Sequence, residues 1–176
     1  MLEWPAGDPD DPLTVPNYYA SGKDRHGWQA IGYLHPPTTG EYTFYLAADE
    51  FAEVWLSTDD SASNAVKIAE LTSRSTQRDF RESQNSRGMS DKITLEKGKR
   101  YYIEVIAKDN WGQDYMAVAW KIPGSDEPGY RGSPILGKYL QPMTEKLDKY
   151  VAYKDCLLYT SPSPRDQRGY RIPSSA

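Results

Sequence analysis

Apolar and polar residues alternate in short runs between residues 27 and 123, and turn-forming residues separate the runs. Such alternation is typical of the strands of an all-β sandwich or barrel. In the run 41–46 one face is apolar and consists of Tyr42, Phe44 and Leu46. We expect an antiparallel strand with this face buried and the opposite face toward solvent. The next run, residues 52–57, is expected to turn its own apolar positions to the core.

Two later runs predict a β-hairpin. Residues 92–95 alternate, and residues 101–108 are rich in β-branched and aromatic side chains. A four-residue turn, Glu-Lys-Gly-Lys at 96–99, separates them, so we expect the two runs to pair with each other. A further run, residues 115–121, is expected to pair with 101–108. The polar stretch 73–90 is longer than an ordinary connection, and such loops are usually functional or mobile.

The C-terminal part departs from this pattern. Residues 144–155 have apolar positions at helical spacing, which predict one or two helical turns or the start of a truncated module. Residues 156–176 are rich in serine, proline and arginine and resemble a translated sequencing-adapter peptide, with a natural disordered tail as the alternative. We therefore expect a β domain over residues 2–142, a linker or truncated module at 143–155, and a disordered or artefactual tail at 156–176.

Composition narrows the functional classes. The 176 residues are enough for about one domain, and the net charge of −4 argues against a nucleic-acid partner. No apolar run approaches the roughly 18 residues that a membrane-spanning helix needs, so we expect no membrane insertion. The single cysteine, Cys156, rules out an intrachain disulfide and a thiolate metal cluster.

The sequence lacks the motifs of several common enzyme classes. It has no Gly-x-Ser-x-Gly elbow and no glycine-rich phosphate loop, and His26 and His35 do not form a His-x-x-x-His metal pair. We therefore expect no enzymatic activity. A pair of carboxylates for glycoside hydrolysis stays an open alternative, because the distance between them is a spatial property.

Several stretches in the same order resemble the PA14 domain family. They are GYLHPP (32–37), TGEYTFYLAA (39–48), AEVWLST (52–58), ITLEKGKRYYIEVIAK (93–108) and AVAWKIP (117–123), and ILGKYLQP (135–142) resembles the closing segment. The resemblance implies an antiparallel β-sandwich with a barrel-like core, located outside the cell or at its surface as a module of a larger protein. In many members of the family such a module binds carbohydrate.

The resemblance also implies a calcium site. In lectin-like members, two consecutive aspartates after the TGEYTF-like strand hold a calcium ion that also ligates sugar hydroxyls. This chain has Asp49 and Glu50 at that place, and calcium accepts the longer side chain because its coordination geometry is flexible. With oxygen ligands from the loop 109–114, the implied metal set is Asp49, Glu50, Asn110 and Asp114. The alternative is a solvated acidic turn between two strands.

The same loop supplies the implied sugar contacts. Trp111 offers an apolar face for a pyranose ring, and Gln113 offers hydrogen bonds to hydroxyls. The implied carbohydrate-binding residues are therefore Asp49, Trp111, Gln113 and Asp114, with loops 73–90 and 109–114 setting selectivity. Alternatively, Trp111 folds back to cover the end of the sandwich. The pair Asp59-Asp60 is predicted to form an Asx turn rather than a metal site.

Two functions follow. The first is a non-catalytic, calcium-assisted carbohydrate-binding module of a larger secreted or cell-surface protein, whose partners are glycans and the other domains of the parent chain. The second is a structural or protein-interaction PA14 domain whose calcium site has decayed.

Overall fold

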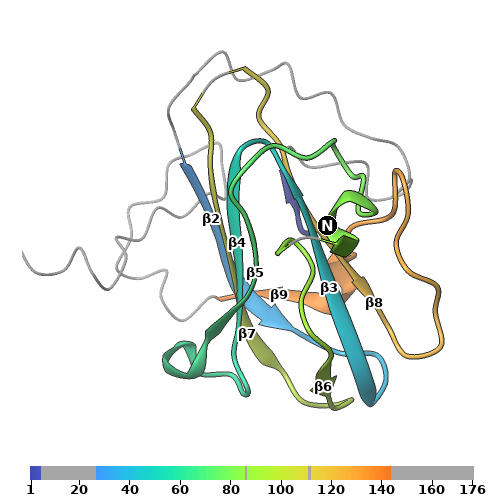
Figure 1. Cartoon of the computed structure of the whole chain (residues 1–176). Helices are drawn as coiled ribbons and strands as arrows, with labels where there is room; N and C mark the ends of the chain where they lie inside the picture. The colour runs from blue at the N-terminus through green and yellow to red at the C-terminus, as the bar shows by residue number, and fades with distance from the viewer. Residues whose placement is uncertain (5–26, 86, 111, 144–176) are drawn as a thin grey trace, which may run out of the picture.

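The structure is a computed structural model that describes residues 1–4, 27–85, 87–110 and 112–143. Two antiparallel β-sheets form the domain (Figure 1). The strands are β1 (Glu3–Trp4), β2 (Gly27–Leu34), β3 (Gly40–Ala48), β4 (Phe51–Leu56), β5 (Val66–Leu71), β6 (Ile93–Leu95), β7 (Tyr101–Lys108), β8 (Met116–Lys121) and β9 (Leu140–Pro142). Three short 3-10 helices join them: η1 (Ala62–Asn64), η2 (Glu82–Asn85) and η3 (Gly137–Tyr139). The expected linker at 144–155, the tail at 156–176 and His26 lie outside the described residues.

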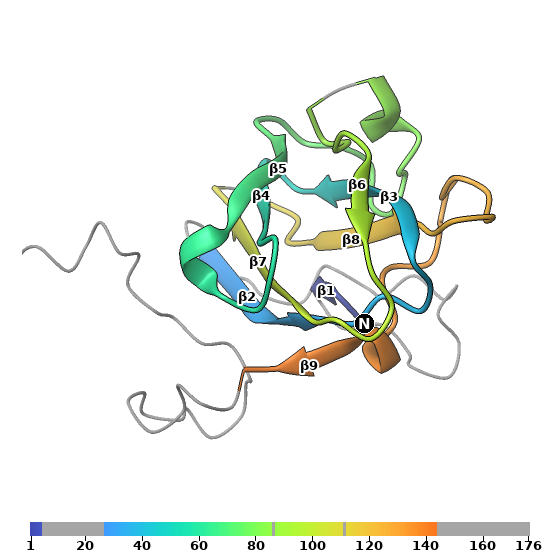
Figure 2. The same ribbon diagram turned by 90° about the horizontal axis from the view of Figure 1, so that it is seen from below.

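One sheet has the strand order β1-β8-β3-β6 and the other has the order β5-β4-β7-β2-β9. Figure 2 shows how the two sheets surround the core. The all-β sandwich is thereby confirmed, whereas the described strands do not close into a barrel. Among the described residues no helix is long and apolar enough to cross a membrane.

The inward faces of the two sheets form the main core. Tyr42, Phe44 and Leu46 of β3 are fully buried and meet the inward side chains of β4, such as Val54, and of β7, such as Val105. The alternation predicted for residues 41–46 and 52–57 is therefore confirmed on the core side.

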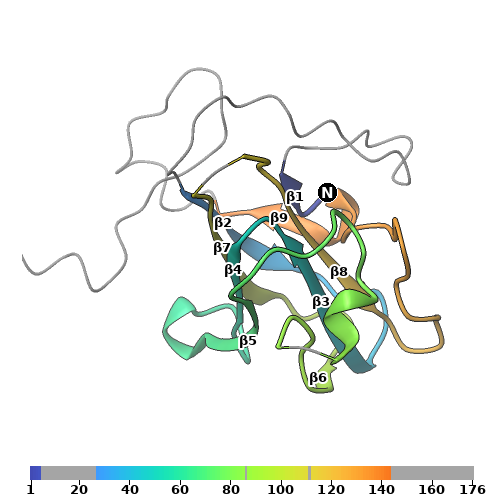
Figure 3. The same cartoon turned by 45° about the horizontal axis from the view of Figure 1, so that its top comes forward.

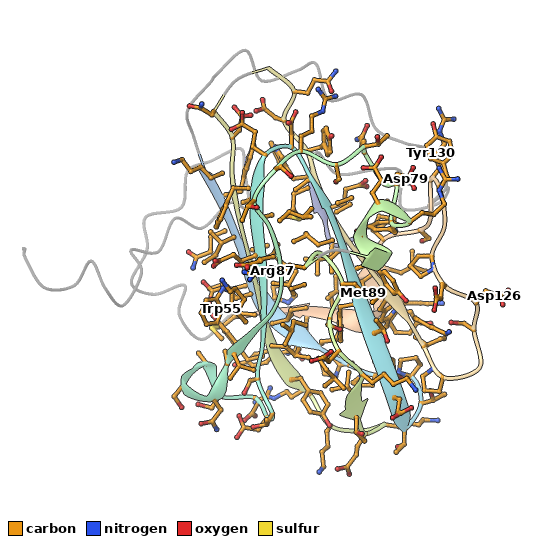
Figure 4. All side chains as sticks on the ribbon, viewed as in Figure 1. Trp55, Asp79, Arg87, Met89, Asp126 and Tyr130 are labelled. Atoms are coloured by element: carbon orange, nitrogen blue, oxygen red, sulfur yellow. The ribbon has the colours of Figure 1, made fainter. Side chains whose placement is uncertain are left out.

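The outer face of β3 differs from the prediction. Tyr45 and Ala47 are also buried, because Phe80 and Met89 from the long connection after β5 pack on them. Met89 lies beside β3 in Figure 4. That connection also hydrogen-bonds along β3: Leu46 N donates to Gly88 O at 2.9 Å. The stretch 73–90 is therefore a packed layer over one sheet, and the expectation that this face of β3 meets solvent was wrong for the second half of the strand.

Both predicted strand pairings were also wrong. β6 pairs with β3 and not with β7, and β8 pairs with β1 and β3 and not with β7. The turn at residues 96–99 does not close a hairpin; it crosses from one sheet to the other. Gly98 has a φ of 88° there, a left-handed conformation that glycine adopts without steric cost. Alternation defines which side chains of a strand face inward, but it does not identify the neighbouring strand.

The last strand, β9, is an edge strand of the five-stranded sheet and pairs with β2. Gly32 faces Pro142 in that pairing. A Cβ atom at position 32 would lie 2.6 Å from the carbonyl oxygen of Gln141. Glycine is therefore required for the close approach of these two strands.

Replacing Gly32 with alanine is expected to lower the free energy of unfolding by about 1–3 kcal/mol, because the added methyl group forces β9 away from β2. Urea unfolding of the variant measures this loss. Gly129→Ala is the matched control, since a Cβ at position 129 has no neighbour within 4 Å. Equal unfolding midpoints for the two variants would show that β9 does not contribute to the stability of the domain.

Candidate functional site

Two connections cross between the sheets at the same end of the sandwich, which Figure 3 turns toward the viewer. The first is the two-residue corner Asp49-Glu50 between β3 and β4, and the second is the loop 109–115 between β7 and β8. Phe51 pairs with Lys108 in antiparallel register. Glu50 precedes Phe51 and Asp109 follows Lys108, so these two residues lie beside each other. On the other side, Asp49 N donates to Tyr115 O at 2.9 Å. The corner therefore lies between the start and the end of the second loop.

Three aspartates at this end of the sandwich are buried. The exposed fraction is 3% for Asp49, 0% for Asp109 and 4% for Asp114. Within the described part of the chain, Asp49 Oδ2 and both carboxylate oxygens of Asp109 have no hydrogen-bond partner. A buried carboxylate is costly unless a hydrogen bond, a cation or a proton compensates it. The corner therefore favours binding of a positive charge.

The pKa of Asp49 agrees with a corner that favours a positive charge. Burial raises the pKa of the Asp49 carboxyl from 3.8 to about 6. The Arg74 guanidinium opposes that rise, while the neighbouring carboxylates of Asp109 and Glu50 add to it, and a backbone hydrogen bond from Glu50 lowers the pKa again. The Asp109 carboxylate therefore lies near enough to Asp49 to raise the pKa of Asp49.

Arg74 lies on the solvent side of this cluster. Its side chain is 57% exposed, and its Nε is 3.9 Å from Asp49 Oδ1. The same Nε donates to the hydroxyl of Tyr115 at 3.3 Å, and Nη2 donates to Gln113 Oε1. The guanidinium therefore interacts with Asp49 electrostatically but does not form a hydrogen bond with it.

The predicted site residues do not all converge. Asp49 and Asp114 are buried at this end of the sandwich, whereas Asn110 is exposed. Glu50 is half-buried with a φ of 67°, a left-handed conformation that is strained for a non-glycine residue. Trp111 lies outside the described residues. No group of three or more carboxylate, histidine or cysteine side chains is gathered closely enough to hold a metal in the described ranges, so the four-residue metal set stays a prediction.

Asp109 was not singled out as a site residue by the sequence analysis. It directly follows the strand 101–108, and the pairing of that strand with β4 brings it beside the Asp49-Glu50 corner. The resemblance brought the loop 109–114 to this site, but the only signal in the sequence for Asp109 itself is its position at the end of a strand.

The second acidic pair is structural. Asp59 Oδ1 accepts a hydrogen bond from Ser61 N at 2.8 Å, and this bond is the main reason why the pKa of Asp59 is lowered. Asn64 Nδ2 donates to Asp59 Oδ2 at 2.8 Å, while Asp60 pairs with Arg100. The predicted Asx turn is confirmed.

Two much longer mouse proteins contain a segment similar to this chain. N-acetyl-beta-glucosaminyl-glycoprotein 4-beta-N-acetylgalactosaminyltransferase 1 is 31% identical over 127 residues, which is 66% of this chain and 12% of the transferase. Fibrocystin-L is 32% identical over 78 residues, which is 44% of this chain and 2% of that protein. The chain thus spans only a small part of these relatives.

This chain is also similar to solved structures and matches a protein family. The A domain of Epithelial Adhesin 6 from Candida glabrata, crystallised with Galb1-3GlcNAc, matches with a TM-score of 0.49 and 17% identity over 74% of this chain and 57% of that one. The A domain of Epithelial Adhesin 9, crystallised with Galb1-4GlcNAc, matches with a TM-score of 0.46 and 17% identity over 61% of this chain and 49% of that one. The family described as the PA14 domain matches residues 13–130. The chain therefore belongs to the PA14 domain family.

Proposed function

We propose that this PA14 domain is a non-catalytic carbohydrate-binding module, with its binding site at the end of the sandwich where the corner 49–50 meets the loop 109–115. One observation supports the site above all. Asp49 and Asp109 are buried, and three of their four carboxylate oxygens have no hydrogen-bond partner among the described residues. A protein keeps such a costly arrangement where it binds a ligand.

Calcium fits the chemistry of this corner. It is a hard cation that takes oxygen ligands in flexible geometry, and the unpartnered oxygens of Asp49 and Asp109 are ligands of that kind. Asp49 and Asp109 would hold the ion, and Asp114 and Glu50 are further carboxylates at the same end. A bound calcium ion supplies coordination positions for two neighbouring hydroxyls of a sugar. Gln113, which is only half-buried, would orient the sugar by hydrogen bonds.

The class of sugar to test first comes from the transferase relative. By its name, that protein acts on an N-acetyl-beta-glucosaminyl glycoprotein. We therefore propose glycans with terminal N-acetylglucosamine or N-acetylgalactosamine as ligands. The great length of both relatives fits a module of a larger secreted or cell-surface protein, whose partners are glycans and the other domains of that protein.

The second candidate is a structural PA14 domain without a calcium site. The position of Arg74 favours it, because a guanidinium 3.9 Å from Asp49 already supplies a positive charge. The two candidates differ in what calcium does to the protein.

A glycan array read in calcium and again in chelator tests the carbohydrate proposal. We expect glycans with terminal N-acetylhexosamine to bind in calcium and to be lost in chelator, because the ion completes the sugar site. The control is Asp126→Asn, an exposed aspartate on the connection after β8 (Figure 4), which should bind as the unaltered protein does. Absence of glycan binding under both conditions would favour the structural domain.

A further inference from the structure

We propose that Arg74 is the resident counter-ion of Asp49, one of the two carboxylates proposed to hold calcium, and that it competes with calcium for this carboxylate. The inference rests on the proposed calcium-assisted function and adds a residue that sets the affinity of the site. The protein should therefore stay folded when no metal ion occupies the acidic corner. Calcium must displace an internal positive charge in order to bind there.

The backbone fixes the position of Arg74. The next residue, Ser75, is buried, and its backbone N–H donates to Ala48 O at 3.0 Å. Its hydroxyl accepts a hydrogen bond from Ala48 N at 3.0 Å. Ala48 directly precedes Asp49, so these two bonds hold Arg74 beside the acidic corner. Arg74 is thus not a surface side chain that reaches the site by chance.

The side chain of Arg74 is anchored as well. The hydroxyl of Tyr115, which is almost completely buried, donates to the carbonyl oxygen of Ser75 and accepts from Arg74 Nε at 3.3 Å. Gln113 accepts from Nη2. These contacts leave the guanidinium 3.9 Å from Asp49 Oδ1, too far for a hydrogen bond. The arginine therefore compensates the charge of Asp49 while Asp49 Oδ2 keeps no hydrogen-bond partner among the described residues.

In this geometry Arg74 and calcium compete for the same carboxylate. A guanidinium and a divalent ion beside the same carboxylate repel each other at short range. Calcium therefore binds only by working against this repulsion or by moving the arginine outward. Such a movement would also break the bond to Gln113 Oε1 and make that acceptor available to a sugar hydroxyl.

Calorimetric titration of calcium into Arg74→Gln tests this. The glutamine keeps a polar side chain of moderate length but removes the charge, so we expect calcium to bind about tenfold more tightly than it binds the unaltered protein. In chelator, the same variant should melt at a lower temperature, because Asp49 loses its counter-ion. Arg74→Lys keeps the charge and should stay close to the unaltered protein in both measurements.

The matched control is Arg87→Gln. Arg87 is exposed and pairs with Glu70 at 2.6 Å (Figure 4), so its loss should change neither calcium affinity nor the melting temperature in chelator by a comparable amount. If Arg74→Gln binds calcium no more tightly than the unaltered protein, the competition is refuted while the calcium site stands. If neither protein binds calcium, the competition and the calcium-assisted function are both refuted.

Discussion

Replacing Arg78 with methionine is expected to lower the free energy of unfolding by about 3–5 kcal/mol. The Arg78 side chain is completely buried and forms a two-pronged ion pair with Glu3, in which Nε donates to Oε1 and Nη2 donates to Oε2. The Glu3 side chain is only 1% exposed. Methionine fills part of the space but leaves the Glu3 carboxylate buried without its cation, and this uncompensated charge is the source of the loss.

The ion pair joins two parts of the fold that are far apart in sequence. Glu3 belongs to β1, which has only two residues and pairs with β8. Arg78 belongs to the connection that covers the outer face of β3. Its loss should therefore loosen both the N-terminal strand and the covering layer.

Chemical denaturation measures the effect. Lys92→Met is the matched control: Lys92 pairs with Glu41 at 3.0 Å, but the two side chains are 71% and 62% exposed, so we expect a change below about 1 kcal/mol. In the double variant Glu3→Met with Arg78→Met both charges are absent, and much of the stability should return. Similar losses for Arg78→Met and Lys92→Met would contradict the burial of the pair formed by Glu3 and Arg78.

Replacing Asp49 with asparagine is expected to stabilise the protein in chelator and to abolish calcium binding. The folded state raises the pKa of this carboxyl from 3.8 to about 6, so it holds the proton more tightly than the unfolded chain does. The stability that this group contributes is therefore fully present below about pH 4 and is lost as the pH rises through 6. At pH 7 the loss is on the order of 2–3 kcal/mol, which a neutral asparagine avoids.

Melting curves in chelator at several pH values between about pH 4 and pH 8 test this pH dependence, because the Asp49 carboxyl titrates within that range. The unaltered protein should lose stability relative to Asp49→Asn as the pH rises, and Asp126→Asn should follow the unaltered protein. A variant that gains stability while losing its ligand is typical of a residue kept for function. If Asp49→Asn were destabilised at pH 7 in chelator, the carboxylate would have a structural role instead.

Much of the fold could be predicted from the sequence. The alternation in β3 and β4 identified the core side chains, such as Phe44 and Val54, because a strand with one face in the core leaves a period of two in its sequence. The partners of β6, β7 and β8 could not be predicted, because their connections cross between sheets and neighbours along the chain are not neighbours in a sheet. The covering layer was missed since Phe80 and Met89 are isolated apolar residues in a polar stretch.

The candidate site was predictable only in part. Asp49 and Asp114 were implied by family resemblance, and both are buried at the expected end of the sandwich. Asp109 and Arg74 come to this corner through the pairing of β7 with β4 and through the bonds between Ser75 and Ala48. Long-range contacts of this kind leave no periodic signal in the sequence.

Calorimetric titration of calcium into the unaltered protein and into Asp109→Asn, with melting curves in calcium and in chelator, tests whether this corner binds calcium. We expect saturable heat, a higher melting temperature in calcium, and the loss of both in Asp109→Asn. An unaltered protein that releases no heat and melts at the same temperature under both conditions would contradict a calcium site at this corner.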